Sequence, residues 1–155
     1  MKKVLVLLTA VVLSTAAQAQ SNQEVIDFYQ SIFGMEKKMI VTQFIQLEGE
    51  AATSFWEIYD EYEVLRKEEG VKRFELLNKY VESYADITDD SANEMLKSAL
   101  AMKKSNLKTL TKYSKKIGKS NGGKVAAQFY QIENYFNNTI ALVITESIPF
   151  VGELD

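Results

Sequence analysis

Residues 49–85 read GEAATSFWEIYDEYEVLRKEEGVKRFELLNKYVESYA, and this stretch decides the fold. Its apolar residues recur every three or four positions, which is the period of a helix with one buried face. The apolar stripe consists of Phe55, Ile58, Tyr59, Tyr62 and Leu65, followed by Phe74, Leu77, Val81 and Tyr84. The stripe changes face between Leu65 and Phe74, so we expect this helix to bend near Gly70.

Three further segments with helical periodicity surround this helix. They cover residues 21–47, 88–117 and about 124–147. The strong helix breakers Gly122-Gly123 and Pro149 bracket the last of them. No window alternates between apolar and polar residues as a half-buried strand would. The sequence therefore predicts an all-α fold with four main helices that form two long helical hairpins.

A weak internal repeat accompanies the two predicted hairpins. Each member of one apolar set has a counterpart 74 residues later: Phe55, Ile58 and Tyr62 are matched by Phe129, Ile132 and Phe136. Each hairpin would then end in an aromatic-rich helix. Two amphipathic helices can also match in this way by chance.

The first nineteen residues have the features of an export signal. Lys2 and Lys3 precede an apolar run over residues 4–13, and Ala17-Gln18-Ala19 is a small-x-small cleavage site. The alternative is a membrane anchor, but the run is about half of the ~20 residues that a span needs. We expect residues 1–19 to be a signal peptide and residues 20–155 to form a single all-helical domain in the periplasm, peripheral to the membrane at most.

The composition argues against catalysis and against metal binding. The chain contains no cysteine and no histidine, which removes the thiolate nucleophile, the usual general base and the commonest metal ligand. We expect Met95 and Met102 to pack in the core. The acidic side chains of the helix over residues 49–85 should face water: Glu57, Asp60, Glu61, Glu68, Glu69 and Glu75. The sequence thus predicts no enzyme, no catalytic residue, no cofactor and no metal site.

Charge is distributed unevenly along the chain. Residues 48–94 contain fourteen acidic and five basic residues, a net charge of −9, whereas residues 95–132 contain nine lysines and no acid. Several lysines advance by three, four or seven positions, so they lie near one helix face. Two readings are open: this face balances the acidic helix, or it binds anionic partners. In the second reading, the residues that bind the partner protein, or client, are Lys104, Lys108, Lys112 and Lys115. The negative net charge and the lack of interleaved aromatic residues argue against nucleic acid.

Several short segments resemble the Spy/CpxP type of periplasmic helical protein, whose signature is Leu-Thr-x-x-Gln. The similar segments are MIVTQF at 39–44, FWEIYDEY at 55–62, ITDDSA at 87–92, AAQFYQIEN at 126–134 and Ile148-Pro149. In the signature, Thr caps the helix and Gln reaches back to form a capping box. Here Thr88 keeps the cap position while Ser91 replaces Gln, and Glu48 and Ala51 stand at the earlier site.

The resemblance implies a stress-related role without cofactors. Members of this group include chaperones that need no nucleotide, inhibitors of envelope-stress sensors and metal sensors, and they often pair into a homodimer with a basic concave face. The metal-sensing role depends on histidines that this chain lacks. We expect a chaperone-like or stress-buffering protein whose partners are unfolded or envelope proteins. The alternative is a regulatory subunit that docks on one sensor protein in the inner membrane.

Overall fold

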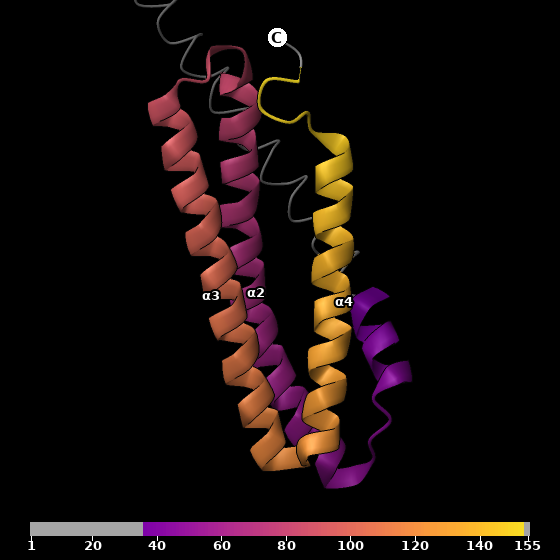
Figure 1. The fold of residues 1–155 in the computed structure, drawn as a ribbon. Helices are drawn as coiled ribbons and strands as arrows, with labels where there is room; N and C mark the ends of the chain where they lie inside the picture. The colour runs from indigo at the N-terminus through magenta and orange to yellow at the C-terminus, as the bar shows by residue number, and fades with distance from the viewer. Residues whose placement is uncertain (1–35, 154–155) are drawn as a thin grey trace, which may run out of the picture. The chain divides into compact units, whose positions relative to one another are not determined.

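The fold is entirely helical in the part of the chain that the computed structural model describes, residues 36–153 (Figure 1). Three long helices dominate it: α2 over Gly49–Ser83, α3 over Asp89–Asn121 and α4 over Gly123–Ser147. Residues 36–44 are also helical, and a 3-10 turn, η1, spans Tyr84–Asp86. The prediction of an all-α fold is confirmed, and the predicted helix ranges beyond residue 48 agree closely with these helices.

The chain divides into two units, Met1–Ile40 and Val41–Asp155, and the three long helices belong to the second. The predicted signal peptide, the predicted start at Gln20 and residues 21–35 of the first helical pattern lie outside the described residues. α2 is unbroken along its whole length and includes Gly70. The bend expected near Gly70 stays a prediction.

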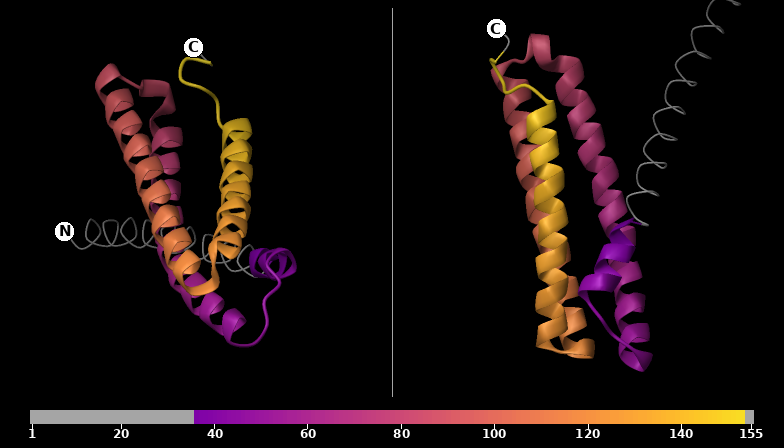
Figure 2. Two further views of the ribbon diagram at one scale, coloured as in Figure 1. Left: turned by 60° about the horizontal axis from the view of Figure 1, so that its bottom comes forward. Right: turned by 90° about the vertical axis from the view of Figure 1, so that its right-hand side faces the viewer.

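The helix α3 packs against both α2 and α4 and runs antiparallel to each of them (Figure 2). Consequently α2 and α4 run in the same direction. The α3–α4 turn depends on Gly122, whose φ of +90° suits glycine far better than other residues. A Cβ built on Gly118 would lie 3.4 Å from the Cβ of Ala126, so α3 and α4 approach closely beside this turn. These two helices form the second predicted hairpin.

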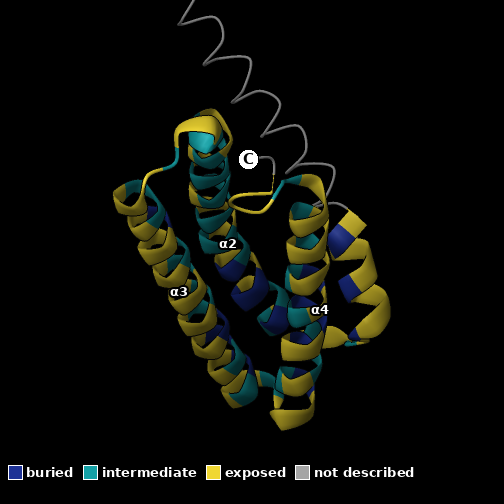
Figure 3. Ribbon diagram, turned by 45° about the horizontal axis from the view of Figure 1, so that its top comes forward, coloured by how far each residue is buried: buried dark blue, intermediate teal, exposed yellow. Residues whose placement is uncertain are grey.

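The core lies at the end of the helices nearest the α3–α4 turn (Figure 3). Phe55, Ile117 and Phe129 are completely buried there. The ring of Tyr62 meets Phe129 edge-on at 5.1 Å and Tyr113 at 5.6 Å between centroids. We call this region the closed end and define it as residues 55–62 of α2, 110–117 of α3 and 125–136 of α4.

Packing is much looser toward the other end of the same helices. The helix α2 has no buried residue after Tyr62, and α4 has none after Phe136. The helix α3 contributes only Met95 ahead of Leu110. We call this region the open end and define it as residues 76–83 of α2, 89–100 of α3 and 140–147 of α4.

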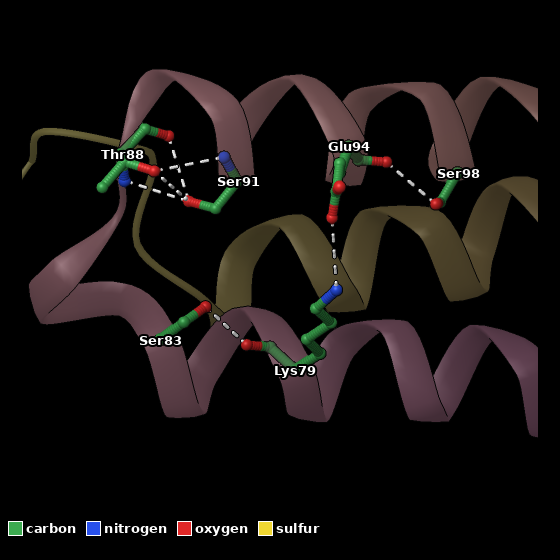
Figure 4. A network of polar contacts seen from close by, with 6 residues as sticks. All are labelled: Lys79, Ser83, Thr88, Ser91, Glu94 and Ser98. Carbon is green, nitrogen blue, oxygen red and sulfur yellow. Dashed lines mark hydrogen bonds and ion pairs between the residues drawn. The ribbon is translucent and has the colours of Figure 1, made fainter.

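A capping box begins α3 at the open end (Figure 4). The Ser91 backbone N–H donates to Thr88 Oγ1 at 3.2 Å, and the Thr88 backbone N–H donates to Ser91 Oγ at 2.9 Å. Nearby, Lys79 Nζ lies 3.8 Å from a carboxylate oxygen of Glu94, which links α2 to α3. At the start of α2, by contrast, the side chain of Glu48 forms no cap hydrogen bond. A side-chain cap therefore forms at the start of α3 and not at the start of α2.

Candidate binding surface

The four lysines selected from the sequence all lie exposed on α3. They belong to a larger group of lysines that borders one open surface hollow, which we call the basic face: Lys104, Lys108, Lys112, Lys115, Lys116 and Lys119. Among the described residues, no acidic side chain borders this hollow. Like charges gathered in this way produce a positive potential that attracts anionic groups.

The acidic helix α2 forms no close ion pair with the four selected lysines within residues 36–153. Lys116 reaches α2, where its Nζ lies 2.5 Å from Glu61 Oε2. In contrast, Lys104, Lys108 and Lys115 form no ion pair with any residue in 36–153. Lys112 likewise forms no ion pair there, and its Nζ lies 5.2 Å from the centre of the Tyr113 ring. Of the lysines of the basic face, Lys116 is the one that forms an ion pair with α2 within residues 36–153.

Exposed leucines run along α3 beside the basic face. Leu96, Leu100 and Leu107 are 58%, 58% and 60% exposed. Steps of four and seven residues place them on one side of the helix, and we call them the leucine stripe. Leu107 also borders the hollow of the basic face. The outer side of α3 thus combines cationic and apolar contacts.

A polar seam fixes how α3 is rotated against α2. The hydroxyls of Ser105 and Thr109 each donate to Glu69 Oε1 at 2.9 Å. The Asn106 side-chain amide, oriented to donate to Glu69, accepts from Arg73 Nη2 at 2.9 Å. Burial lowers the pKa of the Arg73 guanidinium, and the charge of Glu69 opposes this shift. Ser105, Asn106 and Thr109 face α2, whereas Lys108, between them in sequence, is exposed.

The seam corrects one expectation about the acidic residues. Five of the six carboxylates expected to face water are exposed, whereas Glu69 is half-buried against α3. The stretch around Glu69 contains no large apolar residue, which made it resemble a solvated surface in sequence. Its partners are the hydroxyl and amide side chains of α3, so polar residues do the packing that apolar residues do elsewhere.

The closed end contains a buried carboxylate that periodicity alone did not reveal. Glu133 is 0% exposed and accepts hydrogen bonds from the hydroxyls of Tyr59 at 3.2 Å and Tyr62 at 2.8 Å. Burial raises the pKa of both tyrosine hydroxyls, and the nearby charge of Glu133 raises it further. The hydroxyls therefore remain protonated donors. This group joins α2 to α4 and is shielded from solvent, which suits a structural role.

Positive charge lies close to this carboxylate. Arg66 forms a two-pronged ion pair with Glu63, with N–O distances of 2.8 and 3.0 Å. Burial acts to lower the pKa of Arg66, but Glu63 and Glu133 raise it overall. A permanently charged guanidinium within electrostatic reach offsets part of the cost of burying Glu133.

The internal repeat held the signal that could have located Glu133. Tyr59 and Glu133 are 74 residues apart, which is the repeat interval, and they are bonded to each other. The matched apolar positions around them are buried in both helices, as with Phe55 and Phe129. Because α2 and α4 run in the same direction, equivalent positions lie at the same level. A glutamate that replaces a tyrosine inside an otherwise apolar match therefore marks a polar contact in the core.

A second feature not foreseen from sequence is an apolar groove of about 340 Å³ at the open end. The helices α2, α3 and α4 all contribute to its walls, and so do residues 148–151, which follow α4. The Tyr80 hydroxyl donates to the Pro149 carbonyl, and the Tyr84 hydroxyl donates to the Phe150 carbonyl, both at 2.7 Å. Met95, expected in the core, is buried and lines this groove, while Met102 is half-buried.

No group of three or more metal-ligating side chains occurs within residues 36–153. Within the same range, no helix combines the length and the apolar character needed to cross a bilayer. No protein-family model, curated protein or solved structure matches this chain. The surface of α3 and the groove are therefore the features from which a function can be inferred.

Proposed function

We propose that this chain is an exported helical protein that holds unfolded or envelope proteins on the outer side of α3, without a cofactor. One observation carries the proposal: four exposed lysines that have no ion pair with any described residue lie beside three exposed leucines. Such a surface suits a chaperone-like or stress-buffering role in the periplasm.

The two kinds of side chain would act at different stages of binding. Exposed lysines attract acidic segments over a range of ~8 Å at physiological ionic strength, beyond which salt screens them. The leucine stripe then removes apolar client surface from water, which stabilises the contact by about 25 cal/mol per Å². Long, mobile lysine side chains can adapt to many anionic sequences, so they favour broad rather than narrow specificity.

Light scattering by a denatured client protein tests the proposal. We expect the wild-type protein to suppress aggregation, and to do so less well at high salt. A variant with Lys104, Lys108, Lys112 and Lys115 all changed to Glu should not suppress aggregation. This variant should still fold, because exposed charges contribute only ~0–1 kcal/mol each to stability.

A second quadruple variant supplies a matched control with the same change in net charge. It carries Lys→Glu at Lys67, Lys72, Lys79 and Lys124, which are exposed but do not border the basic face. We expect it to suppress aggregation nearly as well as wild type. No suppression by wild type at any salt concentration would contradict the proposal and favour the regulatory subunit of one inner-membrane sensor. An affinity pull-down from envelope extract would then recover a single partner.

A further inference from the structure

The four residues after α4 leave the helix and line one side of the apolar groove of the open end. We call residues 148–151 the strap. Ile148 adjoins the end of α4, and Pro149, Phe150 and Val151 follow it. The strap is tied at its far end by a turn in which the Glu153 backbone N–H donates to the Phe150 carbonyl at 3.0 Å.

The groove contacts the strap by means that any polypeptide could satisfy. Tyr80 and Tyr84 stand one helical turn apart, with ring centroids 5.7 Å from each other. Their hydroxyls donate to two successive main-chain carbonyls, those of Pro149 and Phe150. Every peptide offers such carbonyls, so these two bonds select an extended backbone rather than a sequence. The apolar walls add a preference for apolar side chains.

The strap is held weakly. Phe150 and Val151 remain 64% and 63% exposed, and Ile148 and Pro149 are only half-buried, so no residue of the strap is fully buried. An isolated hydrogen bond between neutral groups has a net value of about 1 kcal/mol. A segment held by so few contacts can be displaced by a competing segment of similar chemistry.

We propose that the groove is a binding site for extended apolar segments of other polypeptides, and that such a segment displaces the strap from Tyr80 and Tyr84. This inference rests on the proposed function and assigns it a second contact. Leu96 belongs both to the groove wall and to the leucine stripe, so the groove continues into the outer side of α3. Eleven residues of helix, or about 16 Å, separate Leu96 from Leu107 beside the lysines. An extended segment of about five residues spans that distance, which allows an apolar segment in the groove and an acidic flank on the basic face.

The test uses a fluorescent peptide with the sequence of residues 147–155, SIPFVGELD, added to the protein as a separate molecule. We expect the full chain to bind it weakly, because the attached strap competes at a high effective concentration. A chain that ends at Ser147 should bind it at least tenfold more tightly. The same peptide with Ile148→Asp and Phe150→Asp should not bind to the shortened chain.

Two tyrosine variants examine the carbonyl contacts. In the shortened chain, Tyr80→Phe and Tyr84→Phe each remove one hydroxyl and keep the ring. Each should weaken peptide binding roughly fivefold, which corresponds to one hydrogen bond. Unchanged binding in both variants would overturn the proposed mode of recognition.

Two further comparisons do not depend on whether the shortened chain folds. Ile148→Asp in the full chain should release the strap and raise peptide affinity without shortening the protein. Ala99→Phe should fill the groove and abolish binding, whereas Ala101→Phe, on the exposed side of α3, should not. Equal binding by all chains would contradict the inference. If the protein suppresses aggregation but does not bind the peptide, the inference about the groove is wrong and the proposed function stands. If it binds the peptide but does not suppress aggregation, the proposed function is wrong and the groove still binds the peptide.

Discussion

The two ends of the three-helix unit are built from the same helices but in different ways. At the closed end, aromatic rings from α2, α3 and α4 interlock around the buried carboxylate of Glu133. At the open end, the side chains of the same helices surround a groove, and the tyrosines there bond to main-chain carbonyls of the strap. The closed end thus supplies most of the buried surface that stabilises the fold. The open end leaves apolar surface accessible in the groove.

The largest expected contrast is between two phenylalanines. Phe129 is completely buried at the closed end, and Phe150 is 64% exposed on the strap. Phe129→Ala should lower the free energy of unfolding by about 3–5 kcal/mol. Phe150→Ala should change it by no more than ~0.5 kcal/mol. Chemical denaturation followed by circular dichroism measures both. A similar loss of unfolding free energy in the two variants would show that the closed end does not stabilise the fold more than the strap does.

High pH should act on the closed end through Tyr59 and Tyr62. Burial raises the pKa of both hydroxyls in the folded protein, whereas in the unfolded chain they ionise near pH 10.0. The unfolded state therefore releases protons that the folded state retains, and alkali favours unfolding. The stabilisation is complete below about pH 10 and falls above it by about 1.4 kcal/mol per pH unit for each tyrosine.

Replacing tyrosines by phenylalanine tests whether this pH effect comes from Tyr59 and Tyr62. The double variant Tyr59→Phe with Tyr62→Phe should be less stable at neutral pH, but its stability should fall much less steeply above pH 10. The control variant removes the hydroxyls of Tyr130 and Tyr135, which are 44% and 61% exposed. It should keep the wild-type slope. Urea denaturation at intervals between pH 9 and pH 11.5 gives the slopes, and a wild-type slope in the double variant would count against a buried pair of donors.

The smallest expected effect concerns the capping box at the open end. Thr88→Ala removes the acceptor for the Ser91 backbone N–H and should cost about 1 kcal/mol. Glu48→Ala at the start of α2 should cost less, because the Glu48 side chain forms no cap hydrogen bond. Thermal unfolding of both variants shows which substitution costs more stability. A larger loss for Glu48→Ala would mean that Glu48 stabilises the start of α2 more than the capping box stabilises the start of α3.

Periodicity predicted the helices well because apolar residues recur every three or four positions along most of each helix. Gly122-Gly123 gave the α3–α4 turn, since only a glycine readily takes φ near +90°. Thr88 gave the start of α3, since its hydroxyl serves a backbone donor that no helical carbonyl can reach. These signals are local, so one sequence contained enough information to find them.

The missed features all depend on contacts between distant segments. Glu69 has the sequence surroundings of a surface residue, but in the structure it accepts hydrogen bonds from Ser105 and Thr109 of α3. Glu133 is one acid among many, and its burial follows from two tyrosines more than seventy residues away. The groove arises where the apolar sides of three helices do not meet, which no single helix pattern records. The lysines of α3 were found from sequence because their exposure needs no partner.

Native-state hydrogen exchange tests the contrast between the ends most directly. It measures the free energy of opening for each backbone amide, from near zero in loose regions up to the value for global unfolding. Amides in residues 55–62, 110–117 and 125–136 should exchange only through global unfolding. Amides in residues 76–83, 89–100 and 140–147 should exchange through openings that cost several kcal/mol less. Equal protection at the two ends would contradict the division between a stabilising closed end and a binding open end.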